Sequence, residues 1–82
     1  MILVDQAIWN YKGRRWAHLV SDSSFDELHI FAESLGLTRS MFQDDHYDIH
    51  HDLRQKAITL GAHAVDFRVL ARALKEAGLR RR

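Results

Sequence analysis

The central part of the chain, Trp16–Leu37, is WAHLVSDSSFDELHIFAESLGL and predicts a strand followed by a helix. The strand is rich in apolar residues and ends near Val20. The helix begins with a capping box, in which Ser24 and Glu27 satisfy free amide groups of the first turn reciprocally. Gly36 ends it, because glycine readily adopts the left-handed conformation that closes a helix. Between these ends, apolar residues recur at helical spacing: Phe25, Leu28, Phe31, Ala32 and Leu35.

Two further strands are predicted on either side of this stretch. Met1–Val4 is apolar and indicates a first strand, which could extend to Trp9. It would form a hairpin with the central strand through Asn10–Gly13, since Asn and Gly tolerate the positive φ of tight turns. His63–Asp66 is a short third strand that joins the same sheet.

Two further helices are predicted from apolar residues at helical spacing. One runs from about Asp52 to Leu60 and turns Leu53, Ala57 and Leu60 inward. The other begins after Asp66 as its N-cap. Its inward residues are Phe67, Leu70, Ala73, Leu74 and Ala77. We therefore expect a single α/β domain over residues 1–82, with a small sheet of about three strands packed against three helices in the order β-β-α-α-β-α.

Composition narrows the class of protein. The chain has 82 residues, and its 46% hydrophobic and 28% charged residues are typical of a globular domain. It has no cysteine, which excludes a disulfide framework and a thiolate zinc site. It also lacks a signal peptide and any apolar run long enough to cross a bilayer, so we expect a cytoplasmic protein without membrane contact. A chain this small buries little surface, which leaves a homo-oligomer open.

Basic residues gather at the end of the chain, although the net charge is only +1. The tail of about residues 79–82 holds Arg80, Arg81 and Arg82. It is either a solvated end that aids solubility or an arm that binds phosphate.

The segment Asp44–Asp52, DDHYDIHHD, carries most of the polar chemistry. If it is extended, His46, Asp48 and His50 point to one face, because side chains alternate along a strand. Two imidazoles and a carboxylate are a plausible ligand set for Zn²⁺ or another divalent metal, with His51 and Asp52 as outer contacts. The alternative is a polar loop, in which Asp48 or Asp52 caps the following helix and His50 and His51 lie in solvent.

A second group of candidate residues lies on the central strand. Arg15, Trp16 and His18 are on the strand itself, and Asp22 follows it just before a helix N-terminus, where α/β domains commonly bind ligands. Arginines beside a helix N-terminus attract phosphate. Three aromatic residues, Trp9, Tyr11 and Trp16, could stack a base or belong to the core.

Asp5 follows the first predicted strand and leaves several interpretations open. It suits a strand-end contact or a salt bridge with Arg15. It could also converge with Asp22 and Asp48 in space.

Five segments together resemble an uncharacterised bacterial and phage family, the domain of unknown function 4031. They are Trp16–Asp22, Glu27–Ala32, Leu35-Gly36-Leu37, His46-Tyr47-Asp48 and Leu60-Gly61-Ala62. The resemblance covers nearly the whole chain and implies a bacterial or phage origin, but no activity. The pattern includes His46-Tyr47-Asp48 and not the following pair His50-His51. It thereby narrows the candidate ligand-binding site to Arg15, Trp16, His18, Asp22, His46, Tyr47 and Asp48.

Three functions remain open, and the sequence does not settle whether the protein is an enzyme. The first is binding of a small phosphorylated or nucleotide-like molecule, with Arg15 on the phosphate and His46 and Asp48 setting its orientation. In a phage, such a protein could sequester a host signalling nucleotide. The second is a metal-dependent hydrolase or nuclease that uses His46, Asp48 and either His18 or His50. The third is an adaptor that binds nucleic acid or protein through its basic tail.

Overall fold

The computed structural model describes residues 1–80 and has a mixed α/β fold. The helices are α1 (Phe25–Ser34), α2 (His51–Thr59) and α3 (Phe67–Glu76), with a short 3-10 turn at Arg39–Met41. The strands are β1 (Ile2–Val4), β2 (Trp9–Tyr11), β3 (Arg14–Ser21), β4 (Phe42–Gln43), β5 (His46–His50) and β6 (His63–Ala64).

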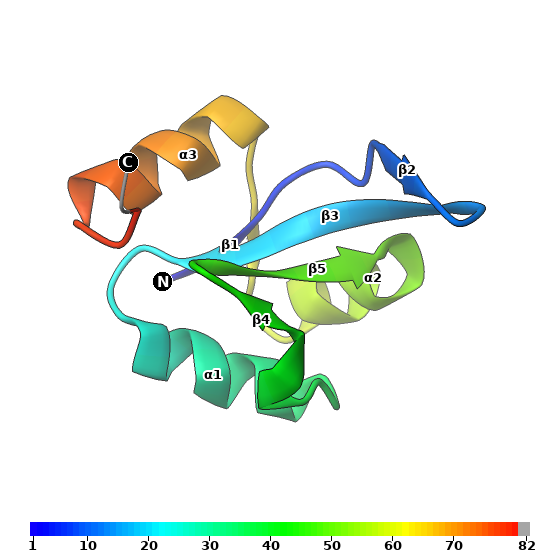
Figure 1. Ribbon diagram of the computed structural model, residues 1–82, viewed down its shortest axis with the longest axis horizontal. Helices are drawn as coiled ribbons and strands as arrows, with labels where there is room; N and C mark the ends of the chain where they lie inside the picture. The colour runs from blue at the N-terminus through cyan, green and yellow to red at the C-terminus, as the bar shows by residue number, and fades with distance from the viewer. Residues whose placement is uncertain (81–82) are drawn as a thin grey trace.

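All six strands belong to one sheet, in the order β4-β5-β3-β1-β6, with β2 paired to β3. The pairs are antiparallel except β1 with β6, which is parallel. Helices cover both faces, because α1 and α2 lie on one side of the sheet and α3 lies on the other (Figure 1). Each face therefore has its own core.

The larger core lies under α1 and α2. It contains alternate residues of the central strands, among them Ala17, Leu19, Tyr47 and Ile49. The smaller core lies under α3, where Leu70 and Leu74 pack on Leu3 and Val20. Side chains at intervening positions of β3 and β5 belong to the α3 face, since neighbouring residues of a strand point to opposite sides. This alternation places His18 and Asp48 on the α3 face.

The predicted number of strands is too small. The central strand pairs with Met1–Val4 as expected, but its hairpin partner is β2, which the sequence prediction did not separate from the first strand. The polar segment after α1 forms β4 and β5 instead of a loop. The strand β4 was missed because it has only two residues. The strand β5 was considered only as the alternative to a loop, because its polar residues hide the buried alternation of Tyr47 and Ile49. The observed order is β-β-β-α-β-β-α-β-α.

The helix ends agree with the sequence except at two points. Ser24 and Asp66 cap α1 and α3 through their side chains, as predicted. Glu27, however, does not complete the capping box, since its carboxylate contacts Ser21 and the amino group of Met1. At α2 the N-cap is His50, so neither Asp48 nor Asp52 caps this helix.

Two further predictions concern residues at the ends of the later helices. Leu60 was expected to be buried but is 48% exposed, because it lies just beyond the last turn of α2. Arg80, in the basic tail, donates through Nε to Asp45 Oδ2 at 3.0 Å. Arg81 and Arg82 lie outside the described residues. Among residues 1–80, none of the helices has the length and apolar character that a membrane span requires.

Candidate functional site

Three polar side chains meet on the α3 face of the sheet: His18 on β3, and His46 and Asp48 on β5. His18 is directly opposite Asp48 in the strand register. Asp48 Oδ1 lies 3.3 Å from His46 Nε2 and 3.9 Å from His18 Nε2. One donor atom from each residue lies within 4.8 Å of the other two. We call these three residues the His–Asp centre.

Asp5, which directly follows β1, holds the ring of His18 in place. Its carboxylate is fully buried and accepts twice from His18, from the backbone N–H at 2.6 Å and from ring Nδ1 at 2.7 Å. Arg54 of α2 fixes the position of Asp5 by donating Nε to its carbonyl oxygen at 2.7 Å. Because a carboxylate only accepts, Nδ1 of His18 carries a proton and Nε2 faces the centre. The hydrogen bond to Asp5 raises the pKa of His18, against the opposing effect of burial.

Asp45 holds His46 in the same way. It lies in the turn between β4 and β5, is buried, and accepts from His46 Nδ1 at 2.8 Å. Its other oxygen accepts from Arg80. Burial alone would raise the pKa of Asp45, but the hydrogen bonds from Arg80 and His46 outweigh burial and lower it. The second imidazole is therefore also oriented with Nε2 towards Asp48.

This geometry is close to that of a cation site. Two ligand atoms on a tetrahedral zinc ion lie roughly 3.3 Å apart. The separation of His46 Nε2 from Asp48 Oδ1 has this value, and His18 Nε2, 3.9 Å from the same oxygen, would have to move closer to bind the ion. Histidines that bind zinc usually donate their second ring N–H to a carboxylate, a backbone carbonyl or water, which fixes the ring and raises its basicity. Both histidines of the His–Asp centre have such a carboxylate. Three protein ligands would leave one position open for water or substrate, as in catalytic zinc sites.

Aromatic rings enclose His18. The rings of Trp9 on β2 and Phe67 at the start of α3 lie 5.4 and 5.7 Å from it, centroid to centroid. The His46 ring lies 5.1 Å away. Such packing restricts rotation of the imidazole and limits water around it, which strengthens electrostatic interactions at the centre.

A cleft of about 600 Å³ opens beside the His–Asp centre, and both His18 and Asp48 contribute to its lining. Most other lining residues are aromatic or aliphatic, including Trp9, Tyr11, Trp16, Leu37, Met41 and Leu53. The volume lies in the range of small-molecule sites, which are commonly apolar with a few polar groups. The structure thus joins a polar centre to an apolar cleft.

The other residues predicted on β5 lie apart from the centre. His50 is on the same face but opposite Trp16, and its ring contacts the indole edge-on at 6.0 Å. Its Nδ1 is buried and has no hydrogen-bond partner among the described residues. Tyr47 points to the opposite face, where its hydroxyl contacts His29 Nδ1 at 2.8 Å. His18, rather than His50, is the third member of the centre.

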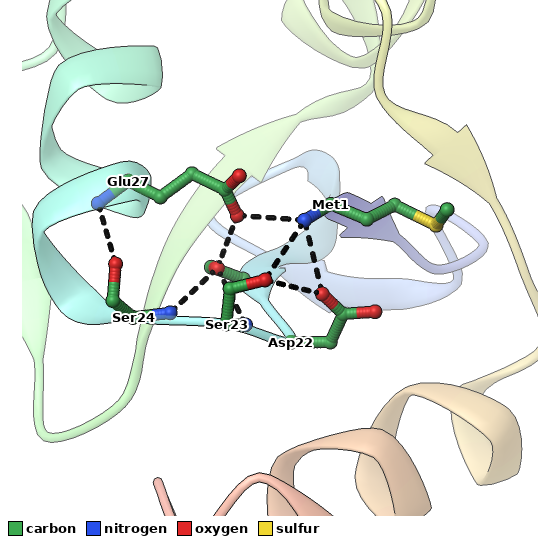
Figure 2. A network of polar contacts seen from close by, with 6 residues as sticks. Met1, Asp22, Ser23, Ser24 and Glu27 are labelled. Atoms are coloured by element: carbon green, nitrogen blue, oxygen red, sulfur yellow. Dashed lines mark hydrogen bonds and ion pairs between the residues drawn. The ribbon is translucent and has the colours of Figure 1, made fainter.

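The residues predicted at the ends of the central strand are also separate from the centre. Asp22 belongs to a second polar network with Ser23, Glu27 and the amino group of Met1, which lies 3.0 Å from Asp22 Oδ1 (Figure 2). That contact lowers the pKa of Asp22. Arg15 is exposed and paired with Asn10 on the hairpin, where strand alternation turns it away from the face of Trp16 and His18.

Sequence reasoning gave Asp5 several roles and did not include Asp45. One sequence feature could have indicated the contact of Asp5 with His18, since Asp5 directly follows a strand that pairs with the strand of His18. No sequence feature indicated the role of Asp45, because that role depends on a turn that brings it against His46 and on Arg80 from the other end of the chain. Convergence of Asp5, Asp22 and Asp48 was one of the possibilities left open, and the structure places Asp5 and Asp48, but not Asp22, beside His18.

Comparison with known proteins identifies the family. The chain matches the model of a family described as a protein of unknown function, DUF4031, over residues 2–77. No curated protein and no solved structure matches it. The matched range includes the His–Asp centre and both carboxylates that orient it. The resemblance noted in the sequence is thereby confirmed, and the chain belongs to the DUF4031 family of proteins of unknown function.

Proposed function

We propose that the protein is a metal-dependent hydrolase in which the His–Asp centre binds a divalent cation such as Zn²⁺ and acts on a phosphorylated small molecule. One observation carries the proposal: two imidazoles, each held at Nδ1 by a buried carboxylate, present Nε2 to the same oxygen of Asp48. With Nδ1 protonated, a neutral ring turns its Nε2 lone pair towards the Asp48 oxygen, which is unfavourable unless a positive charge lies between them. A divalent cation supplies that charge to both rings at once, and the metal titration below distinguishes it from a proton on Nε2.

The chemistry would be hydrolysis of a phosphate ester. A divalent cation held by His18, His46 and Asp48 would lower the pKa of a bound water and so supply a nucleophile near neutral pH. In the hydrolysis, a water oxygen would form a bond to phosphorus while the bond between phosphorus and the ester oxygen breaks. One proton of the water would pass to the departing alcohol, and nothing would be oxidised or reduced. Asp5 and Asp45 keep the two imidazoles in place throughout.

Metal titration tests the first part of this proposal. Isothermal titration of the chelator-treated protein with Zn²⁺ should give one site per chain. At a free metal concentration of about 100 times Kd, binding adds about 2.7 kcal/mol to the free energy of unfolding. For a domain of this size, Tm should rise by roughly 10–20 °C.

Two single-histidine variants provide the matched comparison. His46→Ala should lose both the binding heat and the Tm shift, whereas His50→Ala should keep them, because His50 lies outside the centre. Hydrolysis of the monoester p-nitrophenyl phosphate, followed by the release of nitrophenolate in the presence of Zn²⁺, Mn²⁺ or Fe²⁺, then tests the reaction. A protein that takes up no metal, or a His46→Ala variant that binds like the wild type, would refute the site.

A further inference from the structure

The aromatic residues that line the cleft beside the His–Asp centre indicate what kind of ligand it could bind. Trp9 and Tyr11 are 43% and 61% exposed, so both rings are accessible to a ligand in the cleft. Both belong to β2, and the indole N–H of Trp16 donates to the carbonyl oxygen of Tyr11 at 3.0 Å. The rings are therefore presented on a fixed hairpin rather than on a free loop.

The small number of charged residues in the lining of the cleft also restricts the kind of ligand. Among the described residues that line it there is no Lys and no Arg, and its acidic residue is Asp48 of the centre. A phosphate placed in the apolar part would lose its water without gaining a partner, which is costly. An anionic group can be accommodated only at the end where a bound cation would lie. The remainder of the ligand must be uncharged and able to pack against rings.

We propose that the cleft binds the base of a nucleoside monophosphate, or of a closely similar phosphate ester, against the rings of Trp9, Tyr11 and Trp16, while its phosphate lies at the His–Asp centre. This inference rests on the proposed function and specifies its substrate class. A nucleobase offers a flat apolar face together with polar edges, and stacking on aromatic side chains tolerates different bases. The ligand thus has a charged end and a planar end that correspond to the two ends of the site.

The test compares ligands that carry one or both of these parts. Zn²⁺-loaded protein is titrated with adenosine 5′-monophosphate, cytidine 5′-monophosphate, ribose 5-phosphate and adenosine, with tryptophan fluorescence and calorimetry as readouts. Stacking of a single base corresponds to about a 5- to 150-fold gain in affinity. Both nucleotides should therefore bind more tightly than ribose 5-phosphate by a factor in this range and quench the fluorescence of Trp9 and Trp16.

A variant of the cleft tests the contribution of an aromatic ring to binding independently of the metal. Tyr11→Ala removes an exposed ring and should reduce nucleotide affinity severalfold while leaving Zn²⁺ binding unchanged. The control is Ile30→Ala on α1, which removes an apolar side chain that is 71% exposed and does not line the cleft, and it should change neither.

Each outcome bears on one proposal or the other. Equal affinity for the nucleotides and ribose 5-phosphate would overturn base binding. Octyl phosphate is titrated as a fifth ligand, and tighter binding of it than of the nucleotides would also overturn base binding, because it would indicate an alkyl chain in the cleft. No uptake of Zn²⁺ together with adenosine binding that Tyr11→Ala weakens would reject the metal centre and retain the base site. Zn²⁺ uptake without any preference for the base would do the reverse.

Discussion

Asp5 shows how one residue organises the centre without belonging to it. Its carboxylate is fully buried, yet both oxygens are used, because the backbone N–H and the Nδ1 of His18 each donate to it. A buried carboxylate without such donors would be strongly destabilising. The pair therefore fixes the ring of His18 in the direction that a metal ligand requires.

Asp5→Asn should weaken Zn²⁺ binding by about 10- to 100-fold, the usual effect of removing an outer carboxylate from a histidine ligand. The amide places an N–H₂ group against a donor, so the free energy of unfolding should also fall by about 1–3 kcal/mol. Calorimetry at a temperature where the variant remains folded measures the first effect. Asp52→Asn is the control, since the Asp52 side chain is 75% exposed and is paired with the exposed His51. Unchanged affinity in Asp5→Asn would contradict the orienting role.

The lowered pKa of His29 predicts how the stability of the protein changes with pH. Burial, and then the positive charge of Arg39, lower the pKa of His29 below 6.5. Between that lowered pKa and 6.5 the unfolded chain binds more protons than the folded one, so stability falls as the pH falls through this window. Above 6.5 the residue is neutral in both states and has no effect.

Urea unfolding in chelator at pH 7.5 and 5.5 (values chosen to lie about one unit either side of the ordinary histidine pKa) measures this contribution. The wild type should lose more stability on acidification than His29→Gln, in which the titrating ring is absent. The other histidines act alike in both proteins and cancel in the difference. An identical loss in the two proteins would show that His29 titrates normally.

At the scale of elements, the β2–β3 hairpin determines where the aromatic wall lies. Its turn places Lys12 at φ 49° and Gly13 at φ 77°, both in the left-handed region. This is the conformation of a type I′ turn, whose twist matches that of the flanking strands. Lysine is a poor residue for its first position and glycine a good one for the second.

Gly13→Ala should therefore lower the free energy of unfolding by about 1 kcal/mol, because a Cβ is strained at this φ even where space is open. Lys12→Asn should raise it by a few tenths of a kcal/mol, since asparagine tolerates the left-handed region. Urea denaturation of the two variants checks both signs. The turn assignment would be wrong if Gly13→Ala were as stable as the wild type.

Elements with local signals were predictable from the sequence, and those that depend on pairing were not. The α1 stretch carries its own cap and apolar face, and both were found. The strand β5 was considered only as one option, because its polar positions face a site rather than solvent. Strand pairing also decides which residues form the His–Asp centre. From the sequence alone, His50 and His18 are equally good candidates for the third metal ligand. Only the register of β3 against β5 places His18, and not His50, opposite Asp48.

For the whole molecule, α3 is the element that closes the functional face. Leu70 and Leu74 bury it against Leu3 and Val20, and Phe67 at its first turn contacts His18. The core on this face is the smaller of the two, so few residues hold the helix in place. Loss of α3 packing would expose the His–Asp centre to water.

Leu74→Ala should cost about 2–5 kcal/mol, the range for truncating a fully buried leucine. Small domains commonly have only about 5 kcal/mol in total, so a measurable unfolded fraction is expected. Leu60→Ala is the comparison and should change stability by less than about 0.5 kcal/mol, because that side chain is largely exposed. Thermal and urea unfolding measure both variants. Similar losses would mean that α3 is not anchored through Leu74.

The short length of β4 has one more consequence. It pairs only with Tyr47 and His46, so from Asp48 to His50 the outer edge of β5 has no strand partner among residues 1–80. Successive amides of an antiparallel strand point alternately to the two sides. Those directed towards β3 are bonded, while their neighbours face the open edge. In amide hydrogen exchange, this part of β5 should alternate between slow and fast residues, and a ligand lying along the open edge would slow only the fast ones.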